Sequence, residues 1–223
     1  MLLERIFSRK HPHSVVFRDA SWRLYKAMLR EFDEQPSRVN YDRGTLEIMT
    51  LSVEHEHLKT VLGMMIGLLA LARRLKVMHG GSSTLKRLSR LKGLEADQCY
   101  WVANESKMRG KKRIDLRTDP PPDLVIEIDV MRAVVNREKI YAALGVPEMW
   151  VLRRRDGNEV PTLAAFALEG RAWVPIEHSP SFPFLRVADL NPFVARIAVD
   201  DDTSILSDFA AWARPLPEAG TRP

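Results

Sequence analysis

Four segments of the chain carry the apolar spacing or the end signals that are typical of helices. They cover residues 21–32, 52–75, 133–144 and 205–213. Ser52 is a typical N-cap for the longest of the four, and Gly145 followed by Pro147 is a typical helix end for the third. We therefore expect an N-terminal amphipathic helix, a long main helix, a second, shorter helix and a closing helix.

The segments between these helices have residues and turn signals that are typical of strands. The turn Asp42-Arg43-Gly44 predicts a hairpin over residues 38–49, and Glu169-Gly170 predicts another over residues 162–176. Single strands are expected at residues 76–79, 83–88, 97–103, 123–130 and 148–152. We expect the first four of these to form one sheet, and the last to follow through a parallel crossover.

Length and composition fit one large domain. The chain has 223 residues, of which 45% are apolar, enough for a sizeable core. We expect the domain to cover residues 14–213, between a flexible basic tail (1–13) and a frayed end (214–223). The first residues lack the apolar run of a secretory signal. The longest apolar run, residues 61–72, is short of the roughly 20 residues that span a bilayer, so no membrane partner is expected.

Cys99 is the only cysteine of the chain. One cysteine excludes an intrachain disulfide, a four-cysteine zinc site and an iron–sulfur cluster. It indicates a reducing, cytoplasmic setting.

The chain is basic, and the excess is concentrated in one block. Lys and Arg number 34 against 29 Asp and Glu, a net charge of +5. Residues 73–117 hold 13 Lys or Arg against four acids, a local excess of nine. Such a block favours a surface that follows a phosphate backbone, because each neutralised phosphate releases counterions. A solvated basic face is the alternative.

Three acids interrupt the most apolar strand. Asp123, Glu127 and Asp129 share one of its faces, because side chains alternate, while the apolar residues between them pack the other face. A buried carboxylate is costly unless a metal ion, a Lys or Arg partner or a shifted pKa offsets its charge. An internal salt bridge therefore stays open beside a metal site.

Strand geometry limits which acids can cooperate. Asp123 and Glu127 are about 13 Å apart along the strand and cannot share a metal ion, whereas Glu127 and Asp129 are about 6.6 Å apart and could share one. A ligand from a neighbouring strand is the more usual way to complete the coordination. Asp97 opens the preceding strand, where the register could place it beside Glu127. The alternative is an exposed acid at the start of that strand.

The long helix adds one candidate acid. At about 100° per residue, Glu54 falls on the side of the apolar stripe of residues 58–72, and Glu56 falls opposite. We therefore expect Glu54 to face the sheet and Glu56 to face solvent. His55 and His57 are two residues apart, unlike the i, i+4 pair of a helical zinc site, so zinc ligation is not expected.

The next helix adds a cation. One stripe of this helix holds Arg132, Asn136, Lys139 and Ala143. From this stripe Lys139 could reach the acids, where a lysine can hold or deprotonate a metal-bound water and stabilise charge on a phosphate. A surface cation is its alternative role.

The order of these elements resembles a known class of nucleases. A helix, three strands, a helix and a strand, with an acid on the first helix and acids on the second and third strands, resemble the PD-(D/E)XK nuclease superfamily. Over about residues 15–190 the chain looks like the Uma-two family of restriction endonucleases. The segments that carry this resemblance are Tyr41-Asp42-Arg43-Gly44-Thr45-Leu46-Glu47-Ile48-Met49, Ser52-Val53-Glu54-His55-Glu56, Glu95-Ala96-Asp97, Pro122-Asp123-Leu124-Val125-Ile126-Glu127, Lys139-Ile140-Tyr141 and Gly145-Val146-Pro147-Glu148-Met149-Trp150.

The resemblance implies a fold and a chemistry. It implies a mixed α/β, restriction-endonuclease-like domain with its nuclease core at about residues 52–155, an added N-terminal helix and hairpin, and added C-terminal β structure. It also implies a Mg²⁺ (or Mn²⁺) site in which Asp97, Glu127 and the backbone carbonyl of Ile128 bind the metal and Glu54 helps from the helix. Asp129 is a further candidate ligand. Such a metal polarises a phosphate oxygen and activates water for in-line attack.

One position departs from the superfamily pattern. The strand lysine expected two residues after the acid is Asp129 in this chain, so Lys139 on the following helix would have to take its catalytic role. We expect a metal-dependent endonuclease that cuts DNA. The alternatives are a nuclease-fold protein that binds nucleic acid without cutting it, and a partner-binding assembly module whose acids pair with Arg132 or Lys139.

A homodimer is compatible with all three functions. The helix at residues 22–32 and the chain after Asp189 are the candidate dimer contacts. The alternative is that both segments pack over the edge of the sheet within one chain.

Overall fold

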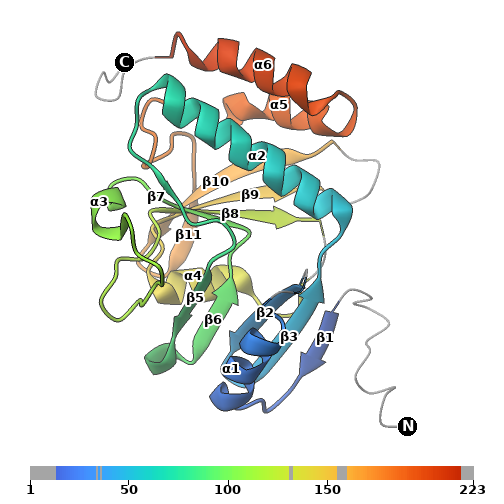
Figure 1. The fold of residues 1–223 in the computed structure, drawn as a ribbon, viewed down its shortest axis with the longest axis vertical. Helices are drawn as coiled ribbons and strands as arrows, with labels where there is room; N and C mark the ends of the chain where they lie inside the picture. Colours follow the sequence, from blue (N-terminus) through green and yellow to red (C-terminus); the bar gives the residue numbers. More distant parts are fainter. Residues whose placement is uncertain (1–13, 34, 36, 131–132, 155–159, 217–223) are drawn as a thin grey trace.

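A computed structural model describes residues 14–33, 35, 37–130, 133–154 and 160–216 (Figure 1). The fold is mixed α/β and is built on two sheets. The expected tail 1–13, Arg132 and residues 217–223 lie outside the described residues. Within the described part of the chain, no helix is both long and apolar enough to cross a membrane.

The larger sheet has six strands in the order β11-β10-β9-β8-β7-β4. They are β4 (Met78–His79), β7 (Gln98–Trp101), β8 (Leu124–Asp129), β9 (Glu148–Arg153), β10 (Thr162–Glu169) and β11 (Ala172–Ile176). β8 and β9 are parallel and α4 (Arg137–Leu144) connects them, as the sequence predicts. The other neighbouring pairs are antiparallel.

Helices cover both faces of this sheet. α2 (Val53–Ala72), α5 (Asn191–Val194) and α6 (Asp202–Ala213) lie over one face, with the short helices η3 (Val187–Leu190) and η4 (Ala195–Ala198) beside α5, and α4 lies on the other face (Figure 1). Ile126 of β8 packs in the core with α2, whereas the adjacent Val125 packs in the core with α4. The strand is therefore covered on both sides, as its apolar pattern predicts.

The smaller sheet has five strands in the order β1-β3-β2-β6-β5. They are β1 (Ser14–Phe17), β2 (Ser37–Asp42), β3 (Thr45–Thr50), β5 (Thr84–Arg87) and β6 (Lys92–Glu95). α1 (Trp22–Glu31) packs on this sheet, where Tyr25 stacks on Tyr41 with ring centroids 5.1 Å apart. The short helices η2 (Leu88–Arg90) and α3 (Glu105–Met108) lie in the connections β5–β6 and β7–β8.

The predicted hairpin turn is confirmed. Arg43 and Gly44, the two residues between β2 and β3, both have positive φ, 44° and 94°. Turns of this hand match the twist of the flanking strands.

Two sequence expectations are wrong. The four single strands do not share a sheet, because β5 pairs with the unpredicted strand β6 and joins the smaller sheet. The helix expected from residue 133 begins only at Arg137, because the side chain of Asn136 caps it by accepting a hydrogen bond of 2.8 Å from the backbone N–H of Lys139.

Both candidate dimer contacts pack within the chain. α1 buries Tyr25 against the smaller sheet, and α6 buries Ile205 and Phe209 in the core that it shares with α2. Each helix thus covers apolar surface of its own chain.

Candidate active site

The register of β7 and β8 brings two acids together. Gln98 pairs with Ile126 in this antiparallel ladder, so the next positions outward, Asp97 and Glu127, stand opposite each other. The Asp97 carboxylate accepts a hydrogen bond of 2.9 Å from the backbone N–H of Ile128. Asp97 is 0% exposed and Glu127 is 6% exposed. The prediction that the register places Asp97 beside Glu127 is confirmed.

Arg137 lies between the two acids. Its Nη2 atom is 2.8 Å from Glu127 Oε2 and 3.4 Å from Asp97 Oδ1. Tyr141, one helical turn later, donates its hydroxyl proton to the same Glu127 carboxylate. The i, i+4 spacing puts Arg137 and Tyr141 on one face of α4, and the cap at Asn136 fixes where that face begins.

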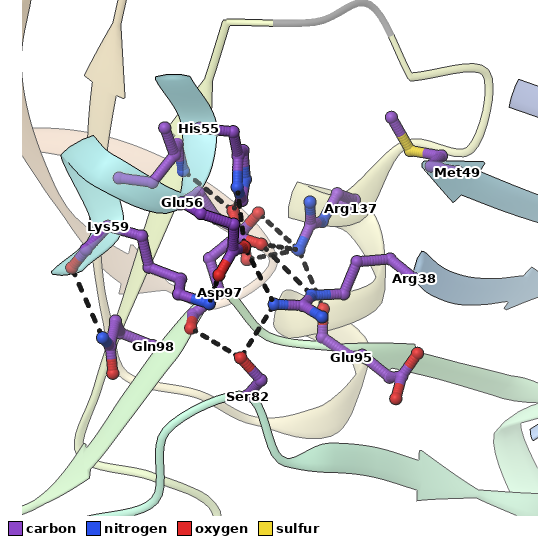
Figure 2. A network of polar contacts seen from close by, with 12 residues as sticks. Arg38, Met49, His55, Glu56, Lys59, Ser82, Glu95, Asp97, Gln98 and Arg137 are labelled. Carbon is purple, nitrogen blue, oxygen red and sulfur yellow. Dashed lines mark hydrogen bonds and ion pairs between the residues drawn. The ribbon is translucent and has the colours of Figure 1, made fainter. Parts of the chain in front are cut away.

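Two further cationic or titratable side chains reach Asp97 from other elements (Figure 2). His55 Nε2, from the first turn of α2, is 3.2 Å from Asp97 Oδ2. Arg38 Nε, from β2, is 3.5 Å from Asp97 Oδ1. Arg38 also donates to Ser82 Oγ at 2.8 Å. The site is therefore built where both sheets and both long connecting helices meet.

Glu56 joins the edge of this network. Its Oε1 atom is 3.8 Å from Arg38 Nη2 and 3.3 Å from His55 Nδ1, and Lys59 pairs with its other oxygen. The side chain of Glu56 is 41% exposed, so it lies at the rim of the network. The expectation that Glu56 simply faces solvent is wrong.

Burial and charge act in opposite directions on the two acids. Burial alone would raise the pKa of Asp97, but the Arg137 guanidinium and the hydrogen bond from His55 outweigh it and hold the pKa well below its usual range. Burial raises the pKa of Glu127 to about 8, with the neighbouring charge of Asp97 adding to the rise and Arg137 opposing it. The pKa values of the two acids therefore shift in opposite directions, downward for Asp97 and upward for Glu127.

The donor atoms at the site match a hard divalent cation. The carboxylates of Asp97 and Glu127 and the carbonyl of Ile128 are oxygen donors, the kind that Mg²⁺ prefers, and Mg²⁺ commonly takes one or two carboxylates and keeps several waters. A cavity of about 390 Å³ opens beside Glu127, Ile128 and Asp129. Among the described residues, no three His, Cys, Asp or Glu side chains cluster as a preformed metal cage. The donor set fits Mg²⁺ bound through few protein ligands.

The structure places Glu54 away from the acid pair. Its side chain is 45% exposed and pairs with Arg154 at 2.6 Å. The expectation that Glu54 faces the sheet is wrong, and His55 is the residue of this turn that reaches Asp97. A helical wheel predicts the direction of a side chain around the helix axis, but it does not predict which other elements lie beside each turn. At the first turn of α2, Glu54 forms an ion pair with Arg154 at the surface.

Lys139 also lies away from the acids. It is exposed and lines a different cavity from the one beside Glu127. The expectation that Lys139 reaches the acids is wrong, because the buried face of α4 holds Ile140, Tyr141 and Leu144, and Arg137 shares that face whereas Lys139 does not. The sequence signal that could have revealed this is the apolar spacing of Ile140, Tyr141 and Leu144 at i+3, i+4 and i+7 from Arg137.

The other strand acids have separate surroundings. Asp129 is 51% exposed on its side chain, pairs with Arg153 at 3.5 Å and lines the cavity beside Glu127. Asp123 accepts hydrogen bonds from the backbone N–H groups of Val102 and Asn104, at 2.7 and 2.9 Å. Asp123 thus stabilises the turn after β7, at the end of β8 away from Glu127.

Part of the basic block is neutralised locally. In the connection between β7 and β8, residues 102–119, three cations pair with acids of the same connection. These pairs are Arg109–Glu105, Arg117–Asp115 and Lys111–Asp119. This part of the block lies beside α3, across the molecule from β1 (Figure 1).

The fold and the paired acids define a restriction-endonuclease-like protein. The sequence matches the family model of Uma2, described as "Putative restriction endonuclease", over residues 22–199. The chain belongs to the Uma2 family, which confirms the resemblance found in the sequence. No curated protein matches the chain.

Proposed function

We propose that this Uma2 member is a metal-dependent endonuclease that hydrolyses phosphodiester bonds of DNA. The observation that supports this function best is the pairing of Asp97 with Glu127 beside the backbone of Ile128, with Glu127 and Ile128 lining a cavity. Two carboxylates and a main-chain carbonyl form the oxygen-rich site that metal-assisted phosphodiester hydrolysis uses. Membership of a restriction endonuclease family points to DNA as the substrate.

In this proposal Asp97, Glu127 and the carbonyl of Ile128 hold Mg²⁺ or Mn²⁺. When bound, such an ion polarises a phosphate oxygen and lowers the pKa of a coordinated water. The remaining steps fall to the side chains of the chain. His55 and the N–H of Ile128 orient Asp97, and Tyr141 orients Glu127.

Arg137 supplies the positive charge of the lysine in the superfamily pattern, but it cannot supply that lysine's acid–base chemistry. A guanidinium stays protonated at every accessible pH, so Arg137 is not the general base. It neutralises the acid pair while the cation is absent, and in the proposed reaction it turns to the phosphate, whose charge its planar fork can bind. Cation binding therefore competes with the contacts that Arg137 makes to Glu127 and Asp97.

One observation favours a second function, binding of nucleic acid without cleavage. Arg137 and Arg38 already bring two fixed positive charges to the two acids. If these ion pairs persist in solution, a divalent cation gains little by entering. The second function keeps DNA as the partner and drops the chemistry.

Calorimetry with MgCl₂ or MnCl₂, run in parallel with nicking of supercoiled plasmid, tests the proposal. The variants are Asp97→Asn and Glu127→Gln, and the matched control is Glu54→Gln, which removes the same type of charge from the exposed end of α2. Metal binding and nicking in the wild type, lost in both site variants and kept in the control, support the endonuclease. If Glu54→Gln also loses metal binding and nicking, Glu54 is part of the site after all.

Two other results separate the remaining functions. A wild type that binds duplex DNA but neither binds metal nor nicks plasmid establishes binding without cleavage. A wild type that binds neither metal nor DNA overturns both functions, and leaves the acids as a structural ion-pair network.

A further inference from the structure

A second cavity, of about 450 Å³, lies beside the start of α4. Three cations line it from three separate parts of the chain: Arg18 from the turn after β1, Arg43 from the β2–β3 turn and Lys139 from the first helical turn of α4. All three side chains are exposed. Among the described residues that line this cavity, Asp42 is the only acid.

The negative charge of Asp42 is already neutralised. Its Oδ1 atom lies 2.5 Å from Lys92 Nζ and 3.1 Å from Arg43 Nε. Among the described residues, the ion pairs include none to Arg18 or Lys139. The cavity therefore has a net positive charge, which the dipole of α4 reinforces because the helix N-terminus is at its wall.

Buried contacts fix the wall of this cavity. Val134 and Val135 line it, and their backbone N–H groups donate to Glu47 of β3 at 2.7 and 3.0 Å. Glu47 is 0% exposed, so a buried, charge-assisted pair of hydrogen bonds holds the segment before α4. The turn at Arg43, with both residues at positive φ, is fixed by the hairpin.

The cavity is adjacent to the one at the acid pair. Asn136 lines both of them, and the segment 133–136 runs between them. One end of α4 thus points Arg137 at the acids and Lys139 into the positively charged cavity. A chain of phosphates passing the acid pair would meet this cavity at the same helix end.

We infer that the cavity lined by Arg18, Arg43 and Lys139 binds a backbone phosphate of the DNA strand whose neighbouring phosphodiester lies at Asp97 and Glu127. Three cations from separate elements around one cavity suit a phosphodiester, whose non-bridging oxygens accept several charge-assisted hydrogen bonds. The inference rests on the proposed function, since it names the contact that positions the substrate of that site. It gives Lys139 a role in binding the substrate instead of the catalytic role expected from the sequence.

Fluorescence anisotropy of a labelled DNA duplex, in EDTA and over a series of NaCl concentrations, tests this inference. The variant combines Arg18→Gln, Arg43→Asn and Lys139→Gln, with asparagine at residue 43 because it tolerates positive φ. The control removes three exposed cations beside α3, with Lys107→Gln, Lys112→Gln and Arg113→Gln. Both proteins lose the same net charge, and thermal unfolding checks that both fold.

The cavity variant should bind roughly tenfold or more weakly than the wild type, with the salt slope reduced by about 0.9, because the variant loses one phosphate contact and each such contact contributes about 0.9 to that slope. The α3 control should keep most of the affinity. Equal losses in the two variants overturn the inference, because a general electrostatic effect then explains binding. Unchanged DNA affinity in the cavity variant also overturns the inference. In that case the proposed function still stands, provided that the wild type binds DNA.

Calorimetry with inorganic phosphate distinguishes a free anion as the ligand. Suppose that inorganic phosphate binds the wild type but not the cavity variant, and that both proteins bind DNA equally well. The cavity is then a site for a small anion, and the inference fails. If the wild type binds no DNA in EDTA or with Ca²⁺, the proposed function itself fails.

Discussion

At the scale of single residues, Asp97 is stabilised by donors from four elements. Arg38 reaches it from β2, His55 from α2 and Arg137 from α4, while the N–H of Ile128 comes from β8. A fully buried carboxylate is costly without such partners. The same carboxylate is therefore a contact point between distant segments and the centre of the proposed site.

Replacing Arg137 should expose the cost of burying the acid pair. Arg137→Met removes the cation that contacts both Asp97 and Glu127, so we expect the free energy of unfolding to fall by about 3–5 kcal/mol. Saturating MgCl₂ should restore part of this loss in the variant and have less effect on the wild type, because Arg137 no longer competes for the acids. Urea unfolding with and without MgCl₂ measures both effects.

The control for this prediction removes the acids as well. A triple variant, Asp97→Asn, Glu127→Gln and Arg137→Met, removes the two buried negative charges together with Arg137 and should recover stability relative to Arg137→Met. If the Arg137→Met variant is as stable as the wild type, Arg137 does not neutralise the acid pair.

Cys99 should be chemically inert in the folded protein. It is 0% exposed, and burial raises the pKa of its thiol to about 12. The thiolate is the nucleophile, so a raised pKa and lack of access both slow the reaction with thiol reagents. We expect no modification at pH 7 to 9 without denaturant and complete modification in urea, followed by absorbance of a thiol reagent. Rapid reaction of the native protein would show that β7 opens locally.

At the scale of elements, one close contact fixes the position of α1 on the smaller sheet. A Cβ atom placed on Gly93 of β6 would lie 2.3 Å from the hydroxyl oxygen of Tyr25 and 2.7 Å from its ring. Tyr25 is 0% exposed and stacks on Tyr41, so the ring has little room to move. Gly93 therefore lets the helix approach β6 directly.

Gly93→Ala should destabilise the protein by about 1–3 kcal/mol, the usual cost of forcing an extra carbon into a packed core. The matched control is Gly67→Ala in α2, where the nearest atom to a Cβ outside the helix is 3.9 Å away and alanine is the better helix former. The control should be neutral or stabilising by up to about 1 kcal/mol in the same urea titration. A neutral Gly93→Ala would contradict the tight packing of α1.

Many elements could be predicted because their signals are local. Ser52 caps α2 and Asn136 caps α4 through side-chain hydrogen bonds to nearby residues. The β2–β3 turn follows from two residues that adopt positive φ. The assignment of β5 and β6 to the smaller sheet could not be predicted in this way, because a strand of four residues does not encode its partner and the pairing depends on contacts far along the chain.

At the scale of the whole molecule, Glu47 connects the two sheets through the segment before α4. It lies on β3, is fully buried, and accepts hydrogen bonds from the N–H groups of Val134 and Val135. That segment forms a wall between the acid site and the positively charged cavity. The relative position of the two proposed subsites therefore depends on one carboxylate from the smaller sheet.

Glu47→Gln should lower the free energy of unfolding by about 1–3 kcal/mol. The NH₂ group of glutamine is a donor, and it would face one of the two backbone N–H donors, those of Val134 and Val135. Hydrogen exchange at residues 133–136 should increase more than at β10, on the far side of the larger sheet. The measurement is urea unfolding combined with exchange by mass spectrometry. Equal protection of residues 133–136 in both proteins would contradict the anchoring role of Glu47.

The sequence by itself determined many local elements and the covered faces of β8, because strand alternation and helix caps are set by neighbouring residues. The register of β7 on β8, which sets Asp97 opposite Glu127, was left open by the sequence. The tertiary structure decided which cations meet those acids. Arg38, His55 and Arg137 come from elements that are distant in the sequence, and Arg137 takes the inward position on α4 that was expected of Lys139. Such long-range choices depend on packing between elements, which no local pattern specifies.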